Sequence, residues 1–573
     1  MGKCQQQFLP VDKLYLQTQR LGPLPIINRF IERLRLEQLL ERFVPTKDKR
    51  VRLPYHKGLG VLLRSILVER EPIYRQQETV CTFAPQAFGL SHLLLAQVGD
   101  DAVGRSLDRL FDADRASLLT ELVVSLADTF DVSFDELHND STSIRFCGQY
   151  HSAKGKSIRG KKAPFITYGY SKDHRPDLKQ LLFIMTTSAD GAVPIQFRCE
   201  AGNESDSRTH EQTWDFLREV IGKPDFLYIA DSKLCNREAL DYIHHRGGRL
   251  LCVIARNRHE DTEFRKWIQS HQPQWELVWD RPHPRRRYGP RDRWWVFRHE
   301  LPSVEGWPVT WVKSSLLRLR QEHRRRERIS EATEELSKYN RKLSGKRPRK
   351  RSRREIFEKV KEILNLHKVS RYISVSLVQE EEHNYRQSAK GRPGPKTQYI
   401  RKTRKFYRLQ WKLDTGAIAY DRESDGMYPL LTNDYQLTPS QVLEAHKRQP
   451  SIEKRFEQTK TVFDIAPIFL KNEGRVEALF YLYFISLVIQ SLIEREIRRS
   501  MKHKGIDSLP LYPEDRANTR PTCEQIFRLF SLAEIHLLTL QGKVVRVFEP
   551  KLTSLQIQVL ELLGVPLSAY RSV

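Results

Sequence analysis

Three acidic residues stand in segments whose pattern suits metal-dependent phosphoryl transfer. Asp140 lies in HNDST, Asp231 follows the apolar strand of YIADSK, and Glu453 lies in the helical segment PSIEKRFEQTK. Two Mg²⁺ ions about 3.5–4 Å apart need hard oxygen ligands of this kind, so that one ion activates the attacking water or 3′-hydroxyl and the other stabilises the leaving oxygen. Each carboxylate alone has a plainer explanation, since an Asp after a strand often caps a turn and a Glu on a helix is often a surface residue.

The segments around these carboxylates predict the elements that would hold them. Residues 131–146 are rich in β-branched and aromatic residues, and LKQLLFIMTTS and AVPIQFRCE flank a turn at Asp190-Gly191, so three strands are expected. A helix in SRTHEQTWDFLREVIG, a strand in DFLYIA, a helix in NREALDYIHHR and a strand in RLLCVIAR follow. This is the order of an RNase H-like core up to its fifth strand. The predicted fold class is therefore α/β, with an RNase H-like mixed-sheet catalytic core.

Sequence on both sides of this core divides the chain into further domains. Residues 1–130 show helical spacing of apolar residues and predict an N-terminal helical domain, which is either a scaffold or a DNA-contacting domain. Residues 131–256 would form the first half of the core and 257–425 an insertion domain. Residues 426–573 would form the second half, with the Glu453 helix and the C-terminal helices. At about 150 residues per domain, the chain length agrees with this division.

The insertion domain is expected to carry a basic helical arm. A long polar helix is predicted over 316–343 and strands over 371–378 and 407–420. The run KRPRKRSRR at 346–354 contains seven Lys or Arg in nine residues. We interpret this run as a phosphate contact, with a solvated charged surface as the alternative. The candidate DNA-binding residues in the run are Lys350, Arg351 and Arg353.

The overall charge points to a polyanionic partner. The chain has 97 Lys and Arg against 71 Asp and Glu, which gives 97 − 71 = +26. Nucleic acid is the expected partner, and a membrane surface is the weaker alternative. The apolar run at 478–493 is short and closely flanked by charges, so we expect a buried core helix and no membrane span. Seven cysteines without a C-x-x-C pair fit a reducing cytosol, and a cytoplasmic, nucleoid-associated protein is expected.

An ordered series of motifs resembles a known family over nearly the whole chain, from Leu24 to Phe530. The motifs are HNDSTSIRFCGQY, YGYSKDHRPDLKQ, GNESDSRT, YIADSKLCNREAL, DGMYPLLTNDYQLTPSQVLEAHKRQPSIEKRFEQTK, EALFYLYFISLVIQSLIEREIRR and PLYPEDR. The chain resembles the DDE transposases of bacterial insertion sequences, in the insertion-sequence-four superfamily and its sixteen-thirty-four branch. The resemblance implies that Asp140, Asp231 and Glu453 are the catalytic and metal-binding triad. It also implies Mg²⁺ as cofactor, with Mn²⁺ as substitute.

The same resemblance implies a reaction and its partners. The protein would cut the ends of its own mobile element and join them to target DNA. Its partners would be double-stranded DNA, both element ends and target, and a second copy of the chain in a homodimeric synaptic complex. Two alternatives remain open: a stand-alone nuclease on the RNase H fold, and a DNA-binding relative that has lost catalysis.

The third motif of the superfamily, Y-x-x-R-x-x-x-E-x-x-x-x-x-x-K, matches in part. Counting from Glu453, the lysine falls on Lys460, which would contact DNA beside the cleaved phosphate. His446 and Gln449 occupy the tyrosine and arginine positions, and Arg448, one residue off, could substitute as a DNA contact. Glu453 and Glu457 are four residues apart and share a helical face, so spacing alone does not choose between them. The resemblance chooses Glu453.

Two further basic residues and one histidine lie near the first carboxylate in the sequence. Lys172 and Arg175 belong to a charged segment, 171–179, that either contacts the DNA backbone or forms an exposed loop with local ion pairs. His138 lies two residues before Asp140 and should point to the same face of the strand. We expect His138 to be a packed or supporting residue rather than a ligand.

Overall fold

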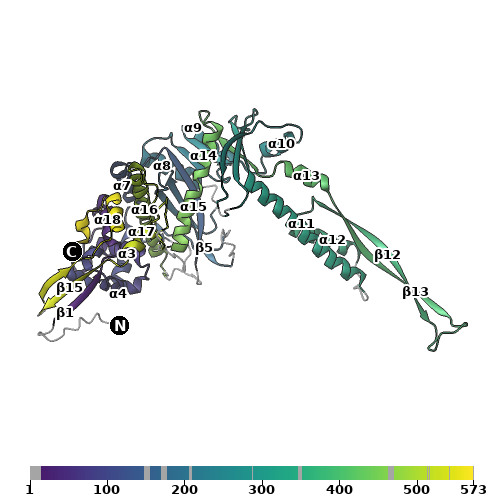
Figure 1. The fold of residues 1–573 in the computed structure, drawn as a ribbon, viewed down its shortest axis with the longest axis horizontal. Coiled ribbons are helices and arrows are strands. Elements are labelled where there is room, and N and C mark those ends of the chain that lie inside the picture. Colours follow the sequence, from purple (N-terminus) through teal and green to yellow (C-terminus); the bar gives the residue numbers. More distant parts are fainter. Residues whose placement is uncertain are drawn as a thin grey trace. The chain divides into compact units, whose positions relative to one another are not determined.

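The computed structural model describes residues 14–146, 155, 157–169, 177–204, 209–284, 286, 288–345, 352–462, 470, 472–512, 514, 516–540 and 543–571 (Figure 1). The chain forms two compact units, which are Met1–Cys252 together with Glu444–Val573, and Val253–Leu443. The first unit therefore combines both ends of the chain, and the second is inserted between them.

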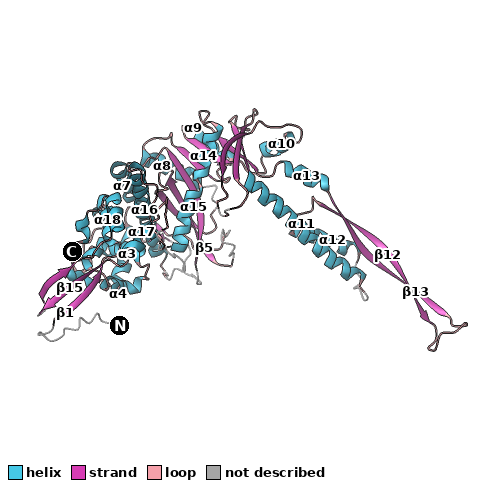
Figure 2. Cartoon of the chain, viewed as in Figure 1, coloured by secondary structure: helices cyan, strands magenta, loops and turns pink. Residues whose placement is uncertain are grey.

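A mixed sheet forms the centre of the first unit (Figure 2). Its strands are adjacent in the order β6-β5-β2-β7-β8. β2 pairs antiparallel with β5, and β5 with β6, whereas β2, β7 and β8 run parallel. This is the strand order of an RNase H-like core, so the predicted fold class is confirmed. The strands are β2 (Glu136–Phe146), β5 (Lys179–Ser188), β6 (Pro194–Ala201), β7 (Leu227–Ala230) and β8 (Arg249–Val253), and the helices that follow β6 and β7 are α8 (Thr209–Ile221) and α9 (Arg237–His245).

One face of this sheet packs against aromatic residues of the long helix α16 (Glu473–His503). The rings of Phe183 on β5 and Phe480 on α16 are 6.0 Å apart and perpendicular, and Phe197 on β6 stacks on Phe484 at 4.9 Å. Edge-to-face and offset-stacked rings are the arrangements that aromatic pairs favour. Strand β5 is buried over most of its length, because it lies inside the sheet and has α16 on one face.

Helix α16 is also the centre of a helical layer. It packs against α1, α3, α6 and α18, which come from both ends of the chain. Its most apolar 18-residue window has the length and hydropathy of a membrane span, but 89% of that window is buried within the fold. It is therefore a core helix in this fold, as expected. The helices of this layer are α1 (Leu24–Arg33), α2 (Leu36–Phe43), α3 (Tyr55–Val68), α4 (Gln76–Cys81), α5 (His92–Leu95), α6 (Asp100–Asp112), α7 (Arg115–Phe130), α17 (Cys523–Phe530) and α18 (Ser554–Leu563).

A separate three-stranded sheet joins the two ends of the chain. Strand β1 (Tyr15–Arg20) pairs antiparallel with β15 (Glu534–Leu540), which pairs with β16 (Lys543–Phe548). The predicted C-terminal helices are present as α17 and α18, and this sheet is an addition that the sequence did not predict. The remaining short elements of the first unit are β3 (Ser157–Ile158), β4 (Lys161–Lys162), η1 (Ile73–Arg75), η2 (Pro85–Phe88) and η5 (Leu567–Tyr570).

The second unit contains an antiparallel sheet, with strands in the order β14-β11-β10-β9. Trp311 of β11 stacks on Phe264 of helix α10 with ring centroids 3.6 Å apart, and Trp267 of the same helix stacks on Phe297 of β10. The tryptophans of β10 and β11 therefore lie on strands, and Trp267 lies on the helix that packs against them. The elements are α10 (His259–Trp267), β9 (Glu276–Arg281), β10 (Asp292–Arg298), β11 (Val309–Ser314) and β14 (Met427–Thr432).

Two helices and a long two-stranded ribbon form the rest of the second unit. The predicted long helix is present as α11 (Ser315–Ser344), and a second helix, α12 (Arg353–Leu366), follows it. The ribbon consists of β12 (Ile373–Gln387), which is about twice as long as the predicted strand over 371–378, and β13 (Tyr399–Leu413), which begins eight residues before the predicted strand over 407–420. The predicted strand over 407–420 is wrong in its second half, because Asp414 caps helix α13 (Thr415–Glu423) by accepting a hydrogen bond from the amide of Ala417.

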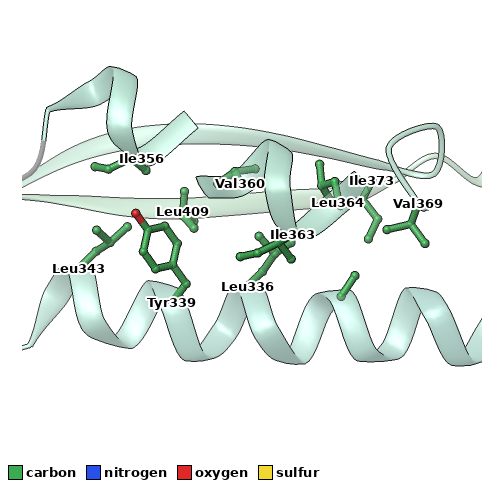
Figure 3. Packing of buried hydrophobic residues seen from close by; sticks show 11 residues of the cluster. Leu336, Tyr339, Leu343, Ile356, Val360, Ile363, Leu364, Val369, Ile373 and Leu409 are labelled. Atoms are coloured by element: carbon green, nitrogen blue, oxygen red, sulfur yellow. The ribbon is translucent and has the colours of Figure 1, made fainter. Parts of the chain in front are cut away.

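A small core of its own holds the ribbon base to the two helices. Leu336 and Tyr339 of α11 face Val360 and Ile363 of α12, with Leu409 of β13 packed among them (Figure 3). All of these side chains are nearly or fully buried. The apolar residues of the ribbon therefore concentrate at its base, where they have something to pack against.

Candidate active site

Strands β2 and β7 place the first two predicted carboxylates side by side. Their parallel ladder pairs Glu136 with Leu227 and His138 with Ile229, a constant offset of 91 positions. Continued by two residues, past the end of β7 at Ala230, the same register would set Asp140 opposite Asp231, because 231 − 140 = 91. Neighbouring strands lie about 4.8 Å apart. Asp140 and Asp231 therefore stand at the point where β7 ends beside the middle of β2.

Backbone amides orient both carboxylates. The amide of Ser141 donates to Asp140 Oδ1 at 2.7 Å, and the amide of Lys233 donates to Asp231 Oδ1 at 2.9 Å. Both aspartates are half-buried. Asp231 thus caps the turn after β7, while Asn236 is the residue that caps helix α9. The cap engages the Oδ1 atom of Asp231.

Glu453 lies on helix α15 (Pro450–Glu457), which packs against β2 and β5. Ile452 and Phe456 on the inner side are buried, and the Phe456 ring meets Phe183 of β5 edge-on at 6.4 Å. Burial raises the pKa of Glu453, the negative charge of Asp140 raises it further, and Lys447 lowers it. Like charges raise a carboxyl pKa in this way only when they are close. Glu453 is exposed on α15, and it is near enough to Asp140 for the two negative charges to interact.

A buried arginine fixes helix α15 in this position. Arg455 donates to the carbonyl oxygens of Gly191 at 2.9 Å and Ala192 at 3.0 Å, in the turn between β5 and β6. It also donates to Glu494 of α16 at 3.0 Å, and both side chains are only 4% exposed. The helix that carries Glu453 is thus tied to two other elements of the same unit.

These carboxylates fit a divalent cation by their chemistry. Asp140 and Glu453 repel each other, and a cation between them would relieve that repulsion. Hard oxygen ligands of this type are those that Mg²⁺ uses. Within the ranges that the structure describes, no group of three or more His, Cys, Asp or Glu side chains is close enough to hold a metal ion. Binding would therefore require the three carboxylate side chains to close further on the ion.

Arg448 and Lys460, the other predicted residues of the third motif, have defined surroundings. Arg448 ends helix α14 (Pro439–Arg448) and forms a two-pronged ion pair with Glu136, at 2.7 and 2.6 Å. A DNA contact by Arg448 would have to replace this pair, and the contact stays a prediction. Lys460 is half-buried in a π-helical turn, η4 (Gln458–Val462). The wider turn changes the rotation per residue, so the spacing of seven does not by itself put Lys460 on the face of Glu453.

The sequence analysis missed Glu136, which supports the same face of β2 as Asp140. Burial alone would raise the pKa of Glu136, but His138 and Arg448 lower it to about 2. His138 is fully buried, with Nε2 2.8 Å from Glu136 Oε1, as expected for a packed residue. The sequence signal that could have identified Glu136 is the alternation of side chains along a strand, which puts residues 136, 138 and 140 on one face.

The remaining predicted DNA contacts are only partly described. Lys172, Arg175, Lys350 and Arg351 lie outside the described residues. Arg353 is exposed at the first position of α12, where its guanidinium lies 5.9 Å from the Phe357 ring. An exposed arginine of this kind is compatible with phosphate contact, which stays a prediction.

Comparisons with known proteins match only part of this picture. Residues 16–124 match the model of a domain of unknown function, DUF4277, which spans the N-terminal helices and none of the three carboxylates. No curated protein matches the chain. A solved structure of the piggyBac transposase synaptic complex with hairpin DNA is similar at 9% identity and a TM-score of 0.26, over 84% of each chain.

Two Mos1 transposase structures are similar over shorter stretches. One is a paired-end complex with the left transposon end, at 12% identity and a TM-score of 0.14, over 34% of this chain and 56% of Mos1. The other is a pre-cleavage transpososome, at 11% identity and a TM-score of 0.14, over 34% of this chain and 57% of Mos1. Similarities this remote carry no structural argument, and the RNase H-like assignment rests on strand order and register.

Proposed function

We propose that this protein is a DDE transposase that cleaves the ends of its own insertion sequence and joins them to target DNA. The proposal is supported by the offset of 91 between β2 and β7, which equals the separation of Asp140 and Asp231, and by the packing of the Glu453 helix against β2. The motif series that resembles the insertion-sequence transposases, and the charge of +26, support DNA as the substrate.

In this proposal each part of the site has a separate role. Asp140, Asp231 and Glu453 hold Mg²⁺, which when bound activates the attacking oxygen and stabilises the leaving one. Asp140 and Asp231 are oriented by backbone amides, and Glu453 is brought in by a helix that Arg455 ties to the sheet. Phosphoryl transfer by such a site depends on positioning and charge, and needs no covalent enzyme intermediate.

The triad can be tested against a neighbouring glutamate on the same helix. We expect Asp140→Asn, Asp231→Asn and Glu453→Gln each to abolish Mg²⁺-dependent nicking of a duplex that carries the DNA flanking the gene, and to leave duplex binding intact. Glu457→Gln is the matched control, because Glu457 is exposed on α15 and has no place in the proposed triad. It should retain most of the nicking activity. A dead Glu457→Gln and an active Glu453→Gln would show that the third ligand is assigned wrongly.

The wild-type protein and the triad variants also distinguish a transposase from the two alternatives, a nuclease and a DNA-binding relative without catalysis. A pre-cleaved end with a free 3′-hydroxyl should be joined to a second duplex by the wild-type protein and by none of the three triad variants. Nicking without joining would identify a nuclease on this fold. Duplex binding without either reaction in the wild-type protein would identify a DNA-binding relative without catalysis.

A further inference from the structure

The β12–β13 ribbon has an anchored base and an exposed distal part. Asn340 of α11 exchanges two hydrogen bonds with the backbone of Leu409, at 3.0 and 2.7 Å. Arg404 donates to the carbonyl oxygens of Ser344 and Gly345 at the end of α11. From 383 to 403 every residue is exposed, except that Gln387 and Thr397 are half-buried. The ribbon continues past the ends of α11 and α12 (Figure 1).

The charge of the ribbon also differs between its base and its distal part. In the base, three consecutive glutamates are neutralised across the ladder, in the pairs Glu380–Arg408, Glu381–Lys405 and Glu382–Arg404. The distal ribbon, residues 383–404, contains seven Lys or Arg and no Asp or Glu. Among the described residues, Arg404 is the only distal cation with an acidic partner. The other distal cations are Arg386, Lys390, Arg392, Lys396, Arg401 and Lys402.

Each face of the distal ribbon carries at least one cation, and the turn between its strands carries three more. The register sets Tyr385 opposite Arg401 on one face and Asn384 opposite Lys402 on the other, and residues opposite each other in a ladder share a face. Arg386 lies opposite Ile400, on the same face as Lys402. Neither face offers a continuous apolar surface for a protein core. A partner that presents negative charge to both faces at once suits this arrangement better than a flat surface.

We propose that the distal ribbon lies in the major groove of duplex DNA, with its two faces toward the phosphates of the two groove walls. The major groove is about 12 Å wide and admits a two-stranded ribbon. With the faces toward the walls, the dimension across the groove is the thickness of a sheet with its side chains, about 10 Å. The five strand residues from 383 to 387 reach about 17 Å at about 3.4 Å per residue, and the turn extends this further. The contact does not depend on the proposed cleavage activity, because no triad residue takes part in it.

The test uses the full chain with the distal ribbon removed in register. His383 and Thr403 are opposite each other in the ladder, so Asn-Gly in place of residues 384–402 would close the hairpin with a two-residue turn. The change removes six cations and keeps the Arg404 anchor. At about −0.9 per phosphate contact, the slope of log affinity against log salt should become shallower by about 3 to 5. An unchanged slope would overturn the proposal and leave an acidic protein surface as the partner.

A matched pair of substitution variants separates local contact from net charge. Arg386→Ser, Arg401→Ser and Lys402→Ser together remove three distal cations. The control, Arg320→Ser, Arg324→Ser and Arg328→Ser, removes three exposed cations of α11. The distal variant should make the salt slope shallower by about 2 to 3 and the control by less than about 1. An equal change in both would overturn the assignment of the contact to the ribbon.

Chemical footprinting tests which groove of the DNA the distal ribbon occupies. Dimethyl sulfate methylates guanine N7 in the major groove and adenine N3 in the minor groove. Guanine N7 protection should be present with the wild-type protein and with Glu453→Gln, and lost with the ribbon deletion. Protection of adenine N3 alone would overturn the major-groove assignment. If the triad variants retain nicking while the ribbon deletion still weakens binding, the proposed function fails and the ribbon proposal stands.

Discussion

Arg455 provides the sharpest test of how the structure positions the third carboxylate. Its side chain donates to Gly191, Ala192, Gln458 and Glu494, at distances between 2.8 and 3.0 Å. Arg455→Met would keep much of the volume of the side chain and remove every one of these donors. The substitution would leave Glu494 buried with one fewer cation, and two backbone carbonyls without a donor.

The magnitude follows from what Glu494 retains. Breaking a buried ion pair by removing one partner costs about 3–5 kcal/mol. Without Arg455, the Glu494 carboxylate still has the guanidinium of Arg498 at 3.4 Å and the amide of Cys523 at 3.1 Å as partners. We therefore expect the lower end of the range, a loss of about 3 kcal/mol in the free energy of unfolding.

Urea unfolding of the full chain, followed by circular dichroism and tryptophan fluorescence, measures this loss. The control is Lys454→Met, which changes an exposed neighbour on the same helix and should stay within about 0.5 kcal/mol of wild type. A double-mutant cycle with Glu494→Gln should give a coupling energy of about 1–3 kcal/mol. A coupling energy near zero, or equal losses of stability for Arg455→Met and Lys454→Met, would show that Arg455 does not hold helix α15 through Glu494.

Arg455 is a positioning residue, so its effect should also be visible where the protein remains folded. Well below the unfolding midpoint, Arg455→Met should lower the rate of Mg²⁺-dependent nicking and leave duplex affinity unchanged. A purely structural role would leave the nicking rate per folded molecule at the wild-type value.

Two further predictions concern the charges of the site. Mg²⁺ at about 100 times its Kd should stabilise the wild-type protein by about 2.7 kcal/mol, seen as a rise in Tm, and should not shift Glu453→Gln. Without Mg²⁺, Glu453→Gln should not lower Tm, because the pKa of Glu453 is raised in the fold and its charged form is already disfavoured there; a clear loss of Tm would contradict that assignment. The pKa of Glu136 falls from 4.5 to about 2 on folding. The ionised Glu136 therefore contributes fully to the free energy of unfolding above about pH 4.5, and this contribution is lost as the pH falls toward 2. Wild type should therefore lose on the order of 2 kcal/mol more than Glu136→Gln between these pH values, and parallel stability curves would show that His138 and Arg448 do not stabilise the Glu136 carboxylate.

The sheet could be predicted from sequence because its strands are buried and punctuated by turns. The apolar runs of 181–188 and 227–230 and the turn at Asp190-Gly191 are local signals that survive in the fold. The cap of α14 was predictable in the same way, since Thr438 and Gln441 exchange hydrogen bonds over a single turn. Such features depend on neighbours in sequence and not on the rest of the chain.

The ribbon could not be predicted in full because most of it has no core to face. Residues 373–378 and 407–413 touch the small core at the ribbon base and show strand-like apolar residues, and these are the parts that sequence analysis found. The distal part is exposed on both faces, so the alternation of apolar and polar residues that identifies a strand is absent. The pair between Glu136 and Arg448 was hidden for another reason, because 312 residues separate the partners.

Glu453 follows the inserted second unit in the chain, but it belongs to the first unit. Glu453 follows Asp231 by 453 − 231 = 222 residues, and most of that interval is the second unit. The contacts that hold α15 come from Phe183, from the β5–β6 turn and from Glu494, all in the first unit. The insertion therefore connects to the Glu453 helix without supplying the contacts described for it. Changes in the ribbon should consequently alter how DNA is held and leave the carboxylate geometry as it is.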